Sequence, residues 1–100
     1  MPISVTVNRK TYESTNKKHA EEVMFESGKY NGGDMAVEMD GWPCTGERGH
    51  DCHRLFTNRS AGRTITVTVG GDHGGYAKNH GKNFGDTGTI TYARGVVTYT

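Results

Sequence analysis

Apolar and polar residues alternate along residues 3–8 and 64–69, and in residues 35–39 the large apolar residues Met35, Val37 and Met39 recur at every second position. This two-residue period is typical of β-strands that bury one face and expose the other. In residues 64–69, one isoleucine and two valines alternate with three threonines. We therefore expect three strands here, each with its apolar side chains turned toward a core.

The spacing of apolar residues becomes helical over residues 17–26. Thr15 and Asn16 offer a cap before this segment, and Gly28 follows it as a residue that ends helices. Glu22 is expected on the solvated surface. The stripe that faces the core is expected to consist of Ala20, Val23 and Met24.

A second, shorter helix is predicted to begin at Cys52 and to end within residues 58–62, with Leu55 and Phe56 facing inward. Residues 89–93 and 96–99 are expected to be two strands, or one strand broken by a bulge. Because no helical pattern precedes them after residue 69, an antiparallel hairpin is the simpler prediction for the C-terminal part. Residues 9–13 are expected to turn back or to form a loop.

The composition fits one small domain that spans residues 1–100. The hydrophobic content is 32% and 15 residues are glycine, so we expect a thin core and many loops. No apolar run is long enough to cross a membrane, and we expect a monomer without membrane contact. The chain opens almost directly onto a strand, which suggests a domain taken from a longer protein.

The formal net charge of +1 does not by itself predict a nucleic-acid partner. Residues 1–47 carry five Lys/Arg and eight Asp/Glu, whereas residues 48–100 carry seven and three. The second half could present a phosphate-facing surface, with Arg54 and Arg59 as candidate contacts. Charge alone favours the alternative, an ordinary solvated surface.

The residues that carry chemistry are His19 and Glu21, near the start of the first helix, and Cys44 and Cys52 downstream. One imidazole and two thiolates can hold Zn²⁺ and leave its fourth position open to water, which is typical of a catalytic zinc site. Glu21 would then carry protons and would not bind the metal. A disulfide in a secreted domain is an alternative for the two cysteines, but the preceding His-x-Glu favours the metal.

The pattern His19-Ala20-Glu21 with Pro43-Cys44 and Cys52 resembles the cytidine-deaminase-like superfamily. Trp42-Pro43-Cys44 is similar to the Ser-Trp-Ser-Pro-Cys stretch of the APOBEC and AID enzymes. The small size and the strands after the second motif look more like the deaminase domains of bacterial polymorphic toxins. This resemblance implies a mixed α/β fold, in which helices pack on a sheet of about five strands that ends in an antiparallel hairpin.

The same resemblance implies hydrolytic deamination of cytosine to uracil in DNA, with Zn²⁺ as the cofactor. A toxin domain of this kind acts in the cytoplasm of a target cell, and an immunity protein is a further partner that it implies. Two residues separate the cysteines in the usual motif, but seven separate Cys44 and Cys52 here. His50, Asp51 or His53 could therefore replace Cys52 as a ligand, although Cys52 is preferred because a pair of thiolates suits zinc.

Candidates for substrate binding lie near the motifs and in one long loop. Trp42 is either a wall against a flipped base or a plug over the core, and its neighbour Pro43 and Ala20 are expected beside the base. Residues 70–88 contain seven glycines and show no helical period. Such loops tend to be functional, although a surface hairpin is the alternative. Its side chains that suit stacking on bases and contact with phosphates are Tyr76, Lys78, His80 and Phe84.

The sequence therefore predicts a zinc-dependent cytosine deaminase that acts on single- or double-stranded DNA. RNA and free nucleosides or nucleotides stay open as substrates. A non-catalytic, zinc-stabilised module that binds nucleic acid is an alternative from another class of function. In that case Glu21 is dispensable, and His50 or His53 fills the fourth position of the metal.

Overall fold

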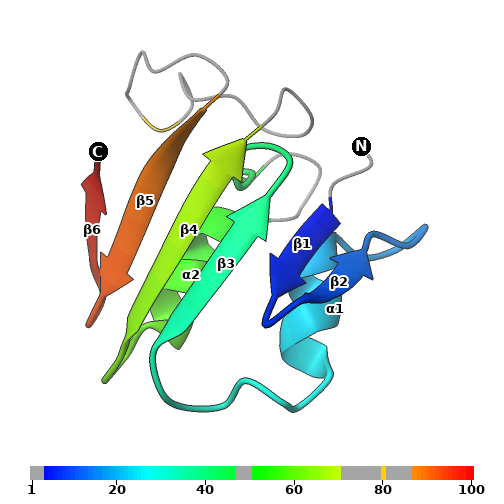
Figure 1. Ribbon diagram of the computed structural model, residues 1–100, viewed down its shortest axis with the longest axis horizontal. Coiled ribbons are helices and arrows are strands. Elements are labelled where there is room, and N and C mark those ends of the chain that lie inside the picture. Colours follow the sequence, from blue (N-terminus) through cyan, green and yellow to red (C-terminus); the bar gives the residue numbers. More distant parts are fainter. Residues whose placement is uncertain (1–3, 47–50, 71–79, 81–86) are drawn as a thin grey trace.

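The computed structural model describes residues 4–46, 51–70, 80 and 87–100. In this part of the chain, six strands form one sheet, and two helices pack on it (Figure 1). The mixed α/β class expected from the sequence is confirmed, with six strands where about five were expected. In chain order the elements are β1 (Ser4–Val7), β2 (Lys10–Glu13), α1 (Ala20–Glu26), β3 (Met35–Met39), α2 (Cys52–Arg59), β4 (Thr64–Gly70), β5 (Thr87–Ala93) and β6 (Val96–Tyr99).

The strands lie in the order β2-β1-β3-β4-β5-β6, and β3 and β4 form the one parallel pair among them. A parallel pair needs a crossover connection, which α2 supplies. The antiparallel pairs β4–β5 and β5–β6 confirm the predicted C-terminal hairpin. Met39 lies opposite Val69, and Val69 lies opposite Gly88. The ends of β3 and β4 and the start of β5 therefore lie at the same end of the sheet.

Two tight turns close the hairpins β1–β2 and β5–β6. Asn8 and Arg9 have φ of 52° and 66°, and Arg94 and Gly95 have φ of 51° and 81°. Positive φ at both central residues is typical of the type I′ turns that match the twist of a hairpin. The second turn makes β5 and β6 separate strands, so the bulge left open by the sequence is not present. Residues 10–13 form an edge strand and not a loop.

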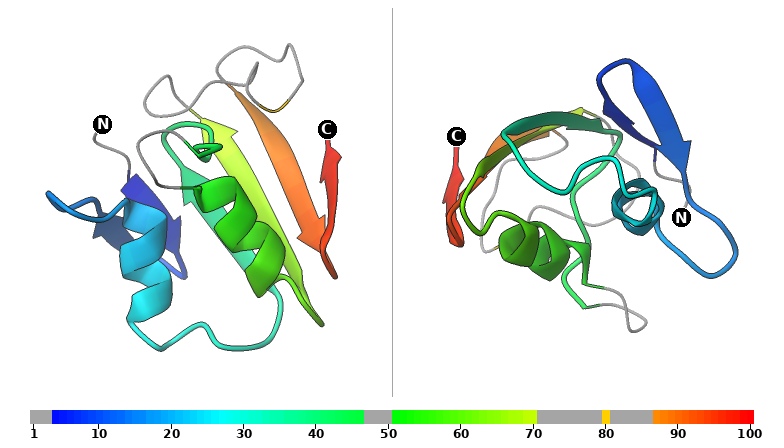
Figure 2. Two further views of the ribbon diagram at one scale, coloured as in Figure 1. Left: turned by 180° about the vertical axis from the view of Figure 1, so that it is seen from behind. Right: turned by 90° about the horizontal axis from the view of Figure 1, so that it is seen from below.

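Both helices lie on the same face of the sheet (Figure 2). α1 contacts β1 and β2, and α2 contacts β5. Phe25 of α1 meets Phe56 of α2 with ring centroids 5.6 Å apart, and Phe56 stacks on Tyr92 of β5 at 5.3 Å. The strands turn their apolar residues toward the helices and leave threonines on the other face. The buried strand residues are Val5, Val7, Tyr12, Met35, Val37, Met39, Ile65, Val67, Val69, Ile90 and Tyr92.

α1 begins at Ala20, three residues later than predicted, and His19 is its N-cap. The prediction that Thr15 caps the helix was wrong, because its hydroxyl accepts hydrogen bonds from the backbone N–H groups of Lys17 and Lys18 and closes a separate turn. Glu22 is not simply solvated: its Oε1 accepts a hydrogen bond of 2.7 Å from the backbone N–H of His19. This bond fixes the point at which the helix starts.

α2 begins at Cys52 as predicted, and it ends within the expected residues. The side chain of Asp51 caps it, since Oδ1 accepts a hydrogen bond of 2.9 Å from the N–H of Arg54. Phe56 is fully buried, whereas Leu55 is half-buried at the edge of the core. Neither of the helices in the described residues has the length and apolar character that crossing a membrane requires.

Candidate metal centre

Three separate connections bring one histidine and two cysteines together. His19 precedes α1, Cys44 follows β3, and Cys52 opens α2. Their ligand atoms all lie within 4.8 Å of one another. Nδ1 of His19 is 3.3 Å from each of the two Sγ atoms. The three residues therefore form a group that could hold a metal ion, and we call it the ligand group.

Backbone hydrogen bonds join the two cysteine segments directly. The N–H of Cys52 donates to Sγ of Cys44 over 3.2 Å, and the N–H of His53 donates to the carbonyl oxygen of Cys44 over 2.9 Å. The longer spacing between the cysteines is therefore compatible with a compact site. Both cysteines are free thiols, so the alternative of a disulfide is not what the structure shows.

His53 turns away from the ligand group although it is adjacent to Cys52. Its Nδ1 lies 2.8 Å from the hydroxyl of Tyr92 on β5. Its ring makes an edge contact with the ring of His80, with centroids 4.5 Å apart. Within the described residues, Cys52 completes the ligand group and His53 does not. His50, another candidate from the sequence, lies outside the described residues.

Glu21 is fully buried, and neither of its carboxyl oxygens has a hydrogen-bond partner within the described part of the chain. Burial raises the pKa of Glu21, and the backbone N–H of Glu21 itself and then the nearby Cys52 thiol offset part of this rise. A buried polar group without a partner costs about 1–3 kcal/mol, and such groups are rare in folded proteins. Glu21 is not a member of the ligand group, and its carboxyl lies close enough to the Cys52 thiol to affect the pKa of that thiol.

The donor set fits a divalent metal with a preference for soft ligands. The pKa of the Cys52 thiol is raised, first by its hydrogen bond to Cys44 and then by burial. A metal ion has the opposite effect, because a coordinating thiol is deprotonated outright. One imidazole and two thiols crowded at a buried site are chemically suited to such an ion.

The other predicted site residues have mixed outcomes. Ala20, Trp42 and Pro43 are buried, and Trp42 is only 2% exposed, as expected of a plug over the core. His80 is half-buried and contacts the Trp42 ring at a centroid distance of 5.6 Å. The remaining loop candidates, Tyr76, Lys78 and Phe84, lie outside the described residues.

Sequence reasoning missed two tyrosines and assigned His53 only as a substitute ligand. Tyr92 is fully buried beneath His53, and burial raises the pKa of its hydroxyl. Tyr99 shares a hydrogen bond of 2.8 Å with Nδ1 of His80. The alternation of β5 places Tyr92 on the same face as Ile90, and this signal could have identified it as an inward residue.

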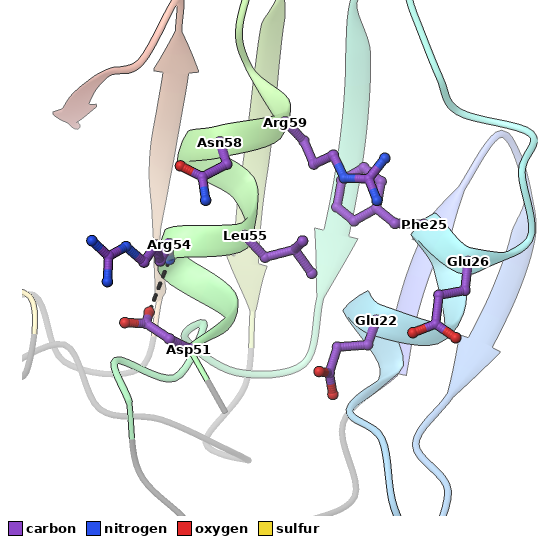
Figure 3. Close-up of a pocket in the computed structure, with 8 residues that line it drawn as sticks. All are labelled: Glu22, Phe25, Glu26, Asp51, Arg54, Leu55, Asn58 and Arg59. Carbon is purple, nitrogen blue, oxygen red and sulfur yellow. Dashed lines mark hydrogen bonds between the residues drawn. The ribbon is translucent and has the colours of Figure 1, made fainter. Parts of the chain in front are cut away.

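A cavity of about 280 Å³ lies between α1 and α2 (Figure 3). It shares no residue with the ligand group or Glu21, and Phe25 and Leu55 supply its apolar lining. The guanidinium of Arg59 lies 5.2 Å from the centre of the Phe25 ring. The polar residues that line the cavity are Glu22, Glu26, Asp51, Arg54, Asn58 and Arg59. The cavity is therefore a groove between the helices, separate from the candidate metal centre.

No protein-family model, curated protein or solved structure matches this chain. The features that bear on function are therefore the ligand group and the buried carboxyl of Glu21.

Proposed function

We propose that the chain is a zinc-dependent deaminase of the cytidine-deaminase-like superfamily, which converts cytosine to uracil in DNA. The observation that supports this most is the environment of Glu21. Its carboxyl is fully buried, lacks a hydrogen-bond partner among the described residues, and lies close enough to the Cys52 thiol for each to shift the pKa of the other. A carboxyl that is buried without a hydrogen-bond partner lowers the stability of the fold. Its position beside the ligand group is therefore better explained by a role in proton transfer.

His19, Cys44 and Cys52 are the residues that hold the zinc ion in this proposal. Two thiolates and one imidazole are a common ligand set for catalytic zinc, with a further position left for water. When bound, zinc supplies Lewis acidity and lowers the pKa of water to near neutrality.

Glu21 moves the protons of the reaction. Its carboxylate accepts a proton from the water that attacks C4 of cytosine. It then delivers protons to N3 of the ring and to the amino group that leaves C4. The water oxygen replaces the amine, so cytosine and water give uracil and ammonia. Both carboxyl oxygens are available for these transfers, because neither is bound to another described residue.

A polymeric substrate is supported by the distribution of charge and by the sheet topology. The half of the chain after residue 47 carries seven Lys/Arg and three Asp/Glu. β4 ends at Gly70 and β5 begins at Thr87, at the end of the sheet where β3 leads into the segment that carries Cys44. A target base in DNA must leave its stack to reach such a site.

The decisive experiment incubates the purified protein with single-stranded DNA, duplex DNA, RNA or cytidine. It measures conversion of cytosine to uracil in each nucleic acid and of cytidine to uridine. We expect uracil in DNA from the wild-type protein. Glu21→Gln keeps the shape of the side chain but removes the proton carrier, so activity should fall at least about 100-fold. The zinc content, measured by mass spectrometry of the metal, should stay the same in this variant.

Each other outcome has a distinct meaning. Glu21→Ala with activity within about tenfold of wild type, or about 1.4 kcal/mol of barrier, contradicts the role of Glu21. Loss of zinc from both Glu21 variants shows instead that Glu21 is a ligand. A wild-type protein that binds zinc and DNA but deaminates none of the four substrates is the non-catalytic binding module.

A further inference from the structure

His80 forms hydrogen bonds to the segment after β3 and to β6. Its Nε2 lies 2.8 Å from the carbonyl oxygen of Pro43, and its Nδ1 lies 2.8 Å from the hydroxyl of Tyr99. The ring also packs against the rings of Trp42 and His53, with centroids 5.6 Å and 4.5 Å away. His80 thus connects three parts of the fold that are distant in sequence: the segment after β3, the start of α2, and β6.

The partners of His80 determine which nitrogen donates. A carbonyl oxygen can only accept, so Nε2 of His80 must carry a proton and donate it to Pro43. In a neutral ring, Nδ1 then accepts the hydroxyl proton of Tyr99. A glutamine at this position can present an amide nitrogen at about the reach of Nε2. An asparagine is one carbon shorter and can replace only Nδ1.

Hydrogen bonds from α2 and from His80 hold the short segment that carries the Cys44 ligand. Two come from the start of α2: Cys52 donates to Sγ of Cys44, and His53 donates to its carbonyl oxygen. Another comes from His80 to the carbonyl of Pro43, one residue before the ligand. Pro43 is buried. Removal of the His80 side chain would therefore take a hydrogen-bond donor from a buried carbonyl oxygen, which costs stability.

We infer that His80 is a positioning residue for the metal centre. It fixes the peptide before Cys44, so that the thiol keeps its place beside His19 and Cys52. Replacing a group that orients a metal ligand typically weakens metal affinity by 10- to 100-fold. Since His80 acts through the backbone of Pro43, we expect an effect at the lower end of this range. The inference depends on the proposed metal centre but not on deamination.

The test compares three substitutions of His80 in the full chain by their zinc dissociation constants, measured in competition with a chromophoric chelator. His80→Ala and His80→Asn should each weaken zinc binding about tenfold. His80→Gln restores the donor to Pro43 and should stay within about threefold of wild type. Tyr99→Phe keeps the ring and removes the hydroxyl, so it should weaken binding less than His80→Ala does.

A second measurement replaces zinc with Co²⁺ and records the absorption bands of cobalt bound to thiolates. These bands report the ligand geometry, which a loss of overall stability alone would not alter. They should shift in His80→Asn and keep their wild-type positions in His80→Gln.

Two results would overturn the inference while the metal centre stands. One is that the wild-type protein binds zinc and that the zinc dissociation constant of His80→Ala lies within twofold of the wild-type value. The other is equal zinc affinity in the Asn and Gln variants, which also decides the question if His80→Ala does not fold. A wild-type protein that binds no zinc overturns the metal centre and this inference together. Zinc binding without deamination overturns only the proposed function, and the affinity ratios still decide the role of His80.

Discussion

His19 and Glu21 are two residues apart, a spacing at which two side chains of one helix face different directions. The sequence could therefore bring them to one site only if the end of the helix pointed at the metal. His19 is not helical: its φ of −76° and ψ of 160° are those of an extended residue. The imidazole leaves the chain before the helix begins, and the carboxyl leaves it within the first turn.

The choice between Cys52 and His53 is also made at the scale of single residues. Neighbours on a helix point about 100° apart, so only one of the two can face His19. Cys52 faces it, and His53 faces Tyr92. Sequence reasoning could rank these candidates by zinc chemistry, but it could not derive their directions, because these depend on where Asp51 starts the helix.

This difference in direction predicts opposite effects of two adjacent substitutions. Cys52→Ser replaces a thiolate with a hydroxyl that zinc binds poorly, and the purified variant should contain almost no zinc. His53→Asn keeps a polar atom near Tyr92 and should retain the zinc content of wild type. Metal analysis of both purified proteins checks the prediction. Zinc retained by the serine variant and lost from the asparagine variant would show that His53 is the ligand.

At the scale of elements, the local sequence was sufficient to predict a strand or a helix where one face of the segment is strongly apolar. β3 was predicted residue for residue, because its large apolar residues Met35, Val37 and Met39 recur at every second position. β2 was missed because Tyr12 is its one buried residue, and edge strands carry little apolar signal. The start of α1 was misplaced because its cap is a histidine paired with Glu22, a combination outside the usual Ser, Thr, Asp or Asn.

The hydrogen bond between Glu22 and the backbone of His19 predicts a specific loss of stability. Glu22→Ala should lower the free energy of unfolding by about 1 kcal/mol, as other losses of helix caps do. For a domain of this size, that corresponds to a fall in melting temperature of about 4–8 °C. Glu22→Gln keeps an acceptor and should lose less. Thermal melts followed by circular dichroism measure all three proteins.

Glu26→Ala is the matched control for this substitution. Glu26 is exposed and pairs with Lys18 at the surface. Exposed pairs contribute about 0–1 kcal/mol, so this variant should melt close to wild type. Equal melting temperatures for the two alanine variants would contradict a special role for Glu22.

At the scale of the whole molecule, the site exists because distant segments meet at one end of the sheet. The parallel pairing of β3 with β4 cannot be predicted from local patterns, since it depends on the crossover through α2. This pairing puts the end of β3, which leads to Cys44, next to the end of β4, while α2 returns behind them with Cys52 at its start. Sequence motifs could name the ligands, but only the topology explains how they converge.

The same topology makes the ligand group a cross-link between parts of a small fold. Helices cover one face of the sheet, and the threonine-rich face carries little of the core. His19, Cys44 and Cys52 belong to three separate connections, so a metal bound to all three opposes unfolding of each. A ligand present at 100 times its dissociation constant adds about 2.7 kcal/mol of stability.

Removal of zinc should therefore lower the melting temperature by about 10–20 °C, given about 4–8 °C for each kcal/mol in a domain of this size. The measurement is a thermal melt before and after treatment with a strong zinc chelator, followed by addition of either Zn²⁺ or Mg²⁺. Zn²⁺ should restore the original value, and Mg²⁺ should not, because it prefers oxygen ligands. Cys52→Ser should melt at the same temperature with and without chelator. If the chelator leaves the wild-type melting temperature unchanged while removing the metal, the ligand group does not join these segments in the folded protein.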